Sequence, residues 1–74
     1  MADLEFKVVE TLGVLSESKK GWRKELNLVS WNGAAPKYDL RTWSPEHDQM
    51  GKGITLSKEE LQELSKILAD FKAE

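Results

Sequence analysis

The chain of 74 residues has no cysteine, one histidine, two prolines and no long apolar run. The absence of cysteine excludes disulfide bonds and thiolate metal sites, and one histidine cannot form a multi-histidine site. A membrane span needs about 18 consecutive apolar residues, and the acidic start "MADLEFKVVE" differs from the basic start of a signal peptide. We therefore expect one domain over residues 1–74 that is cytoplasmic and makes no membrane contact. We also expect it to form a homodimer, because so short a chain without covalent staples builds only a small core.

The sequence also lacks the motifs of common catalytic and phosphate-binding sites, such as G-x-S-x-G or a glycine-rich phosphate loop. Glu46, His47 and Asp48 are consecutive, so a regular element cannot direct all three side chains at one metal ion, and a solvated polar loop is expected there. The "GKG" at 51–53 is expected to form a flexible turn that exposes Lys52. The sequence thus predicts a protein that is not an enzyme, with no catalytic residue, cofactor, metal or small-molecule substrate.

Charge is distributed unevenly along the chain, although the net charge is only −2. Residues 18–43 contain six bases and two acids, a local charge of +4, whereas residues 57–74 contain three bases and five acids, a local charge of −2. A basic middle and an acidic end indicate two surfaces with different roles.

The last part of the chain has the pattern of an amphipathic helix over about residues 58–72. Ser57 and Glu60 have the spacing of a capping box, which marks a helix start. The apolar residues that follow recur at helical spacing and form one stripe: Leu61, Leu64, Ile67, Leu68 and Phe71.

The preceding part of the chain has the pattern of β-strands separated by turns. The expected strands cover residues 4–17, 22–31, 37–43 and 54–56, with turns at "SKKG" and "NGAAP", a polar loop before the last strand, and a bulge or bend at Gly13. The predicted fold class is α+β: a four-stranded curved antiparallel sheet followed by one C-terminal helix that covers one face of the sheet.

Basic and aromatic residues are interleaved in the middle of the chain. On the strand 37–43, Lys37, Arg41 and Trp43 share one face, while Tyr38, Leu40 and Thr42 are expected to pack toward the helix. Lysine and arginine attract phosphates and aromatic rings stack on unpaired bases, so the combination favours single-stranded nucleic acid. The alternative for the tryptophans is burial in the core or in a dimer interface.

The segments "YDLRTW", "SPEHDQM" and "GKGITLSKEELQEL" resemble the positive cofactor four family of transcriptional coactivators. The pieces "GWRKELN", "VSWN", "PKYD" and "RTWSP" are similar to its short bacterial members of the YdbC type, over essentially residues 4–72. The resemblance implies a ββββα protomer that dimerises through its helices and binds single-stranded DNA in grooves of the curved sheets. By position, Arg41 matches the sheet arginine of the family, Lys52 the base of its "KG" motif and Trp43 an aromatic position. The long Ser- and Lys-rich N-terminal region of eukaryotic members is absent, which puts coactivator activity in doubt and leaves the DNA-binding core.

Together these observations predict a homodimeric, nucleoid-associated single-stranded DNA-binding protein with little sequence preference, serving transcription regulation or DNA replication and repair. Single-stranded RNA binding and a protein-interaction module of the transcription machinery are the alternatives. Arg41, Lys37 and Lys52 are expected to contact phosphates, and Trp31 and Trp43 to stack on bases. The predicted nucleic-acid-binding residues are Lys19, Lys20, Trp22, Arg23, Lys24, Trp31, Lys37, Arg41, Trp43 and Lys52.

Overall fold

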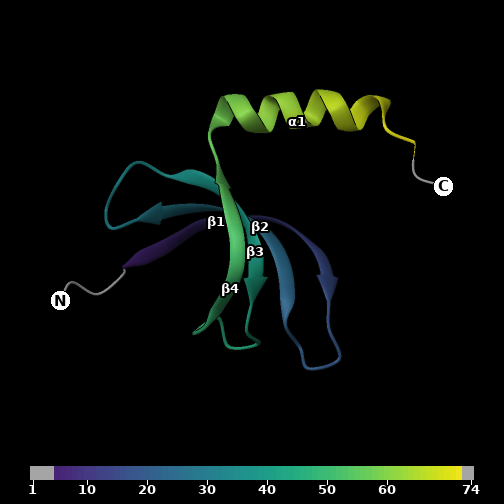
Figure 1. Cartoon of the computed structure of the whole chain (residues 1–74). Helices are drawn as coiled ribbons and strands as arrows, with labels where there is room; N and C mark the ends of the chain where they lie inside the picture. The colour runs from purple at the N-terminus through teal and green to yellow at the C-terminus, as the bar shows by residue number, and fades with distance from the viewer. Residues whose placement is uncertain (1–4, 73–74) are drawn as a thin grey trace.

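The computed structural model describes residues 5–72 as one antiparallel sheet followed by one helix (Figure 1). The strands lie in the order β1-β2-β3-β4, so each pairs with its neighbours in sequence and β1 and β4 form the edges. The elements are β1 (Phe6–Glu17), β2 (Arg23–Trp31), β3 (Lys37–Trp43), β4 (Met50–Leu56) and α1 (Lys58–Asp70). The predicted fold class is confirmed.

The long strand β1 is irregular. Its pairing with β2 shifts register three times, between Val8 and Glu10, between Thr11 and Gly13, and between Val14 and Ser16. The residues at these three points, Val9, Leu12 and Leu15, are apolar and exposed. The bulge expected at Gly13 is thus one of three, and bulges increase the local bend and twist of a strand.

Two tight turns join β1 to β2 and β2 to β3, at positions where the sequence supplies residues that tolerate positive φ. Gly21 has φ 86°, and its N–H donates to the Ser18 carbonyl at 3.0 Å. Asn32 and Gly33 have φ 50° and 76°, and they form the centre of a tight turn that the Ala34 N–H closes by donating to the Trp31 carbonyl at 2.9 Å. The turns expected at "SKKG" and "NGAAP" are confirmed.

Strand β4 begins at Met50 rather than at residue 54, so the expectation of a flexible "GKG" turn is wrong. Arg41 pairs with Gly53, and Trp43 pairs with Met50 across a register shift. A Cβ atom at Gly53 would overlap the Arg41 side chain and the Leu40 carbonyl. The glycine is therefore required for close approach within a strand. Lys52 is exposed as expected, but it projects from β4.

Helix α1 begins at the predicted capping box. The Glu60 N–H donates to Ser57 Oγ at 3.1 Å, and the Ser57 N–H donates to Glu60 Oε1 at 2.8 Å. The helix ends at Asp70, two residues before the predicted end.

The helix does not cover a face of the sheet, contrary to the expectation. It contacts β3 and β4 and buries none of its residues, and Figure 1 shows it leaving the end of β4 and extending to one side. Ile67, Leu68 and Phe71 are 65%, 56% and 64% exposed. The apolar stripe therefore lacks a partner within the single chain.

The two faces of the sheet differ in burial. We call the first the aromatic face, and it contains Glu25, Asn27, Val29, Trp31, Asp39, Arg41 and Trp43. We call the second the leucine face, and it contains Leu26, Leu28, Tyr38, Leu40 and Thr42. The register confirms that these sets lie on opposite sides. The aromatic face holds the fully buried Val29 and Trp43, whereas the leucine face is only half-buried. The core of the single chain therefore lies on the face that was expected to be the wetter one.

Candidate nucleic-acid interface

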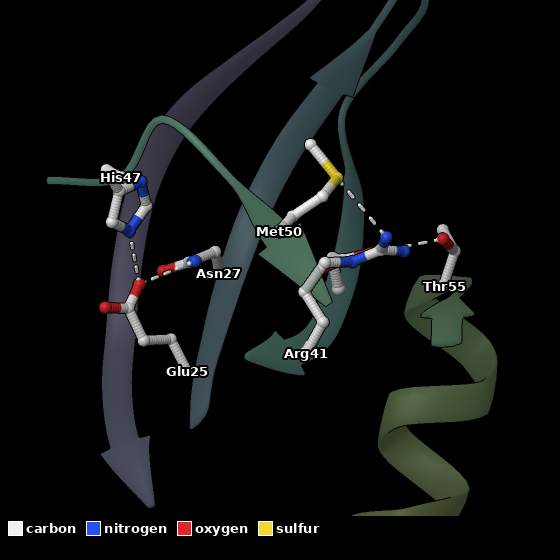
Figure 2. A network of polar contacts seen from close by, with 7 residues as sticks. Glu25, Asn27, Arg41, His47, Met50 and Thr55 are labelled. Atoms are coloured by element: carbon white, nitrogen blue, oxygen red, sulfur yellow. Dashed lines mark hydrogen bonds and ion pairs between the residues drawn. The ribbon is translucent and has the colours of Figure 1, made fainter. Parts of the chain in front are cut away.

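Arg41 lies at the centre of the aromatic face and is held by Asp39. The Arg41 Nε and Nη2 atoms donate to the two carboxylate oxygens of Asp39 at 2.6 and 2.7 Å, and Thr55 Oγ1 donates to Oδ2 at 3.2 Å. Arg41 Nη1 also approaches Met50 Sδ at 3.5 Å, as Figure 2 shows. These contacts engage three of the five guanidinium N–H donors, so two remain for a phosphate oxygen.

Trp31 lies beside this arginine. The Arg41 guanidinium carbon is 4.9 Å from the Trp31 ring centroid, a cation–π distance. Phe6 of β1, which pairs with Trp31, contacts the ring in a tilted arrangement at 6.0 Å between centroids. Trp31 is half-buried, and its indole Nε1 atom is buried without a hydrogen-bond partner among the described residues.

Trp43 is fully buried, so the expectation that its ring lies open to a base is wrong for this structure. Its place on the aromatic face is as predicted, but His47 from the 44–49 loop covers the ring. The two rings stack with centroids 4.2 Å apart and planes 4° apart. Phe6 contacts the same indole at 5.2 Å. Phe6 is distant from Trp43 in the sequence, and His47 lies in a loop outside the strand, which is why strand alternation alone did not reveal these contacts.

His47 is held in place by Glu25 of β2. Its Nε2 atom lies 2.8 Å from Glu25 Oε1, and Asn27 Nδ2 donates to the same oxygen at 3.0 Å (Figure 2). His47 was expected to lie in a solvated loop; instead its side chain is 36% exposed, and its φ is 63°.

Glu25 is a buried carboxylate on a surface predicted to bind an anion. Burial by itself raises the pKa of Glu25, but hydrogen bonds from Asn27 and His47, with the charges of His47 and Arg23, outweigh it and lower the pKa below its usual value. The Arg23 Nε atom lies 3.8 Å from Glu25 Oε2 and also 3.8 Å from Glu17. The carboxylate is therefore held ionised at neutral pH.

The predicted basic residues surround the sheet, but they do not all lie on one face. Lys37 pairs with Val29, and Arg23 pairs with Trp43, so both extend the aromatic face. Lys24 alternates with them and lies on the side of the leucine face. Lys19 and Lys20 lie in the turn between β1 and β2, residues 18–22, which we call the basic turn. This turn contacts the 44–49 loop, because a Cβ at Gly21 would lie 2.9 Å from Pro45 Cγ.

These lysines are free to meet an external anion. Lys19, Lys20, Lys24, Lys37 and Lys52 are exposed, and none of them forms an ion pair within residues 5–72. Lys66 on the helix, in contrast, pairs with Glu63 at 3.0 Å.

Trp22 is half-buried at the start of β2. Its N–H donates to Ser18 Oγ at 3.2 Å and its carbonyl accepts from the Ser18 N–H at 2.7 Å, so it closes the basic turn. The structure gives it no contact with Trp31 or Trp43 among the described aromatic pairs.

Sequence reasoning missed the acidic and amide residues of the aromatic face, Glu25, Asn27 and Asp39, and the role of His47. One signal was available. Polar residues alternate with leucines in "ELNL" and "DLR", so they share a strand face with the tryptophans. Buried polar side chains need partners, and Arg41 and His47 supply them.

Among the described residues, no helix has the length and apolar character that crossing a membrane requires. Within residues 5–72, no group of three or more His, Cys, Asp or Glu side chains is placed to hold a metal ion.

A curved sheet with arginine, lysine and tryptophan on one face, followed by a single helix, has the basic and aromatic character of single-stranded nucleic-acid-binding domains. The family model described as "Transcriptional Coactivator p15 (PC4)" matches residues 18–67, and the chain belongs to this family. The family binds nucleic acid and is associated with transcriptional coactivation. An uncharacterized protein from Treponema pallidum (strain Nichols) is 46% identical to the chain over 66 residues, which cover 89% of this chain and 78% of that protein.

Proposed function

We propose that this protein is a homodimer that binds single-stranded DNA with little sequence preference, in the cytoplasm and near the nucleoid, for transcription regulation or for DNA replication and repair. The observation that carries the proposal is the set of exposed lysines without ion-pair partners in residues 5–72, arranged around a face with tryptophans and an arginine. Free cations beside aromatic rings match the phosphates and unpaired bases of a single strand.

The residues divide into two roles in this proposal. Lys37, Lys52 and the two lysines of the basic turn neutralise phosphates, and Arg41 adds its two free N–H donors. Trp31 stacks on a base, while the Arg41 guanidinium, 4.9 Å from the ring centroid, holds the ring in place. Stacking of this kind is worth about 1–3 kcal/mol per base and discriminates little between bases.

A fluorescence titration of a labelled oligothymidylate at several salt concentrations tests the proposal. We expect binding at low salt that weakens steadily as salt rises, because phosphate neutralisation releases counterions. Absence of binding at low salt would end the proposal. An oligouridylate measured in parallel distinguishes the polymers: tighter binding to the RNA would favour the RNA alternative instead.

Matched lysine variants sharpen this titration. Lys37→Ala should weaken binding and reduce the slope of log affinity against log salt by about 0.7, the contribution of one phosphate on a single strand. Lys66→Ala is the control, because Lys66 lies on the helix and pairs with Glu63. Equal losses from both variants would show that net charge, rather than the aromatic face, determines binding.

A further inference from the structure

The contact between Trp43 and His47 has the geometry of a base stacked on an indole. The imidazole is planar and heteroaromatic, lies parallel to the Trp43 ring at 4.2 Å, and places Nε2 2.8 Å from the Glu25 carboxylate. A nucleobase bound there would make the same contacts, since it has a flat face and an edge with N–H donors. His47 therefore occupies the position of a base.

Buried polar atoms on the aromatic face are unsatisfied. Trp43 Nε1, Asn27 Oδ1 and Trp31 Nε1 have no hydrogen-bond partner among the described residues. Asn27 Nδ2 contacts the same Glu25 oxygen that faces His47, so the Asn27 side chain lies close to the imidazole. Unsatisfied buried polar atoms are uncommon, and a base edge offers groups that imidazole lacks.

The imidazole can leave without unfolding the loop. The 44–49 loop is held by its own hydrogen bonds: Ser44 N–H to the Gln49 carbonyl, His47 N–H to the Ser44 carbonyl, and Ser44 Oγ to Asp48. None of these involves the imidazole, whose polar contact is with Glu25. A change of the His47 side-chain rotamer is sufficient to uncover Trp43, and such changes are fast.

The position also lies on the path of a bound strand. Arg23 pairs with Trp43 in the sheet, and the basic turn with Lys19 and Lys20 touches the loop at Pro45. A base that replaced the imidazole would therefore have cations beside it for its phosphates.

We propose that His47 is a gate on a nucleobase site, covering Trp43 in the free protein and giving way to a base when single-stranded DNA binds. This inference rests on the proposed function. It adds a specific base-binding position and the side chain that opens and closes it. The apparent affinity of a site is reduced by the fraction of time it is closed, so the gate weakens binding in the free protein.

Nuclear magnetic resonance can follow the gate directly, because His47 is the sole histidine of the chain. Its ring protons should be shifted upfield by the Trp43 ring in the free protein, and this shift should disappear when an oligothymidylate binds.

Two variants complete the test. His47→Asn removes the ring at a positive-φ position that Asn tolerates, and it should bind more tightly than wild type. His47→Phe keeps a ring that can stack on Trp43, and it should bind no more tightly than wild type. Heteronuclear spectra of each free variant establish that the fold is retained.

The outcomes separate the two proposals. Binding by wild type with unchanged His47 ring shifts, or weaker binding by His47→Asn than by wild type, would overturn the gate alone. Absence of binding by wild type and by both variants at low salt would overturn the proposed function, and the gate with it.

Discussion

Glu25 shows how one buried side chain links folding to pH. Its carboxylate accepts hydrogen bonds from Asn27 and faces His47, and it lies near Arg23, all on the aromatic face. These partners stabilise the ionised form more than burial opposes it, which is why its pKa is lowered. Loss of the charge would weaken the attachment of the 44–49 loop to β2.

We predict that acid destabilises the protein partly through Glu25. A carboxyl group whose pKa is lowered by folding stabilises the native state above its unfolded pKa, and this contribution is lost as pH falls through the lowered value. We measure the free energy of unfolding in urea at neutral pH and at about pH 3.5. Between these two pH values it should fall less for Glu25→Gln than for wild type. The control is Glu46→Gln, which replaces an exposed carboxyl group. If the free energy of unfolding of Glu25→Gln fell with acid as much as that of wild type, the prediction would be contradicted.

Trp43 marks the limit of residue-level prediction. Alternation along "KYDLRTW" correctly placed Lys37, Arg41 and Trp43 on one face, because the pleat fixes the direction of each side chain. Exposure depends on what lies over that face, and here His47 and Phe6 come from the loop and from β1. The alternation rule applies only within a strand, so it specifies neither a contact with a loop residue nor one with a residue of a distant strand.

At the scale of elements, the sequence predicted most boundaries well, and β4 was the exception. The capping box located the start of α1, and the residues of β3 were predicted without error. Strand β4 contains two glycines that carry no side chain, so its first half shows no alternation. Its existence as a strand depends on pairing with β3, which the local sequence does not reveal.

We predict that Gly53→Ala destabilises the sheet by about 1–3 kcal/mol, the usual cost of forcing extra atoms into a packed position. The added methyl would overlap Arg41 and the Leu40 carbonyl. Chemical denaturation followed by circular dichroism measures the effect. Gly13→Ala is the matched control, because a Cβ there meets no atom within 4 Å, and equal stability of the two variants would disprove the packing argument.

For the whole molecule, charge and apolar surface are separated. Lys19, Lys20 and Lys37 lie on the aromatic face and the turn beside it, whereas α1 has acidic residues in its first turn and an exposed apolar stripe. Ile54 on β4 is also exposed, at 55%. Monomeric proteins seldom leave such apolar residues grouped in solvent, and a second copy related by two-fold symmetry would cover them.

We predict that the protein sediments as a dimer and that Leu68→Glu shifts it toward monomer, because the charge would be placed in the apolar stripe of the interface. Sedimentation equilibrium measures the mass of each variant. Ser65→Glu, at an exposed position on the same helix, is the control. A wild-type chain that sediments as a monomer at all concentrations would disprove the dimer. That result would not decide whether the chain binds DNA, which the oligothymidylate titration measures.

The three register shifts of β1 have a consequence for solubility. An edge strand of twelve residues with exposed Val9, Leu12 and Leu15 would ordinarily be a template on which strands of other molecules add, leading to aggregates. The bulges interrupt the outer row of N–H and C=O groups at regular intervals, so an incoming straight strand cannot pair along its length. The irregular edge therefore keeps a β-rich chain in solution at concentrations where a straight edge would promote fibrils.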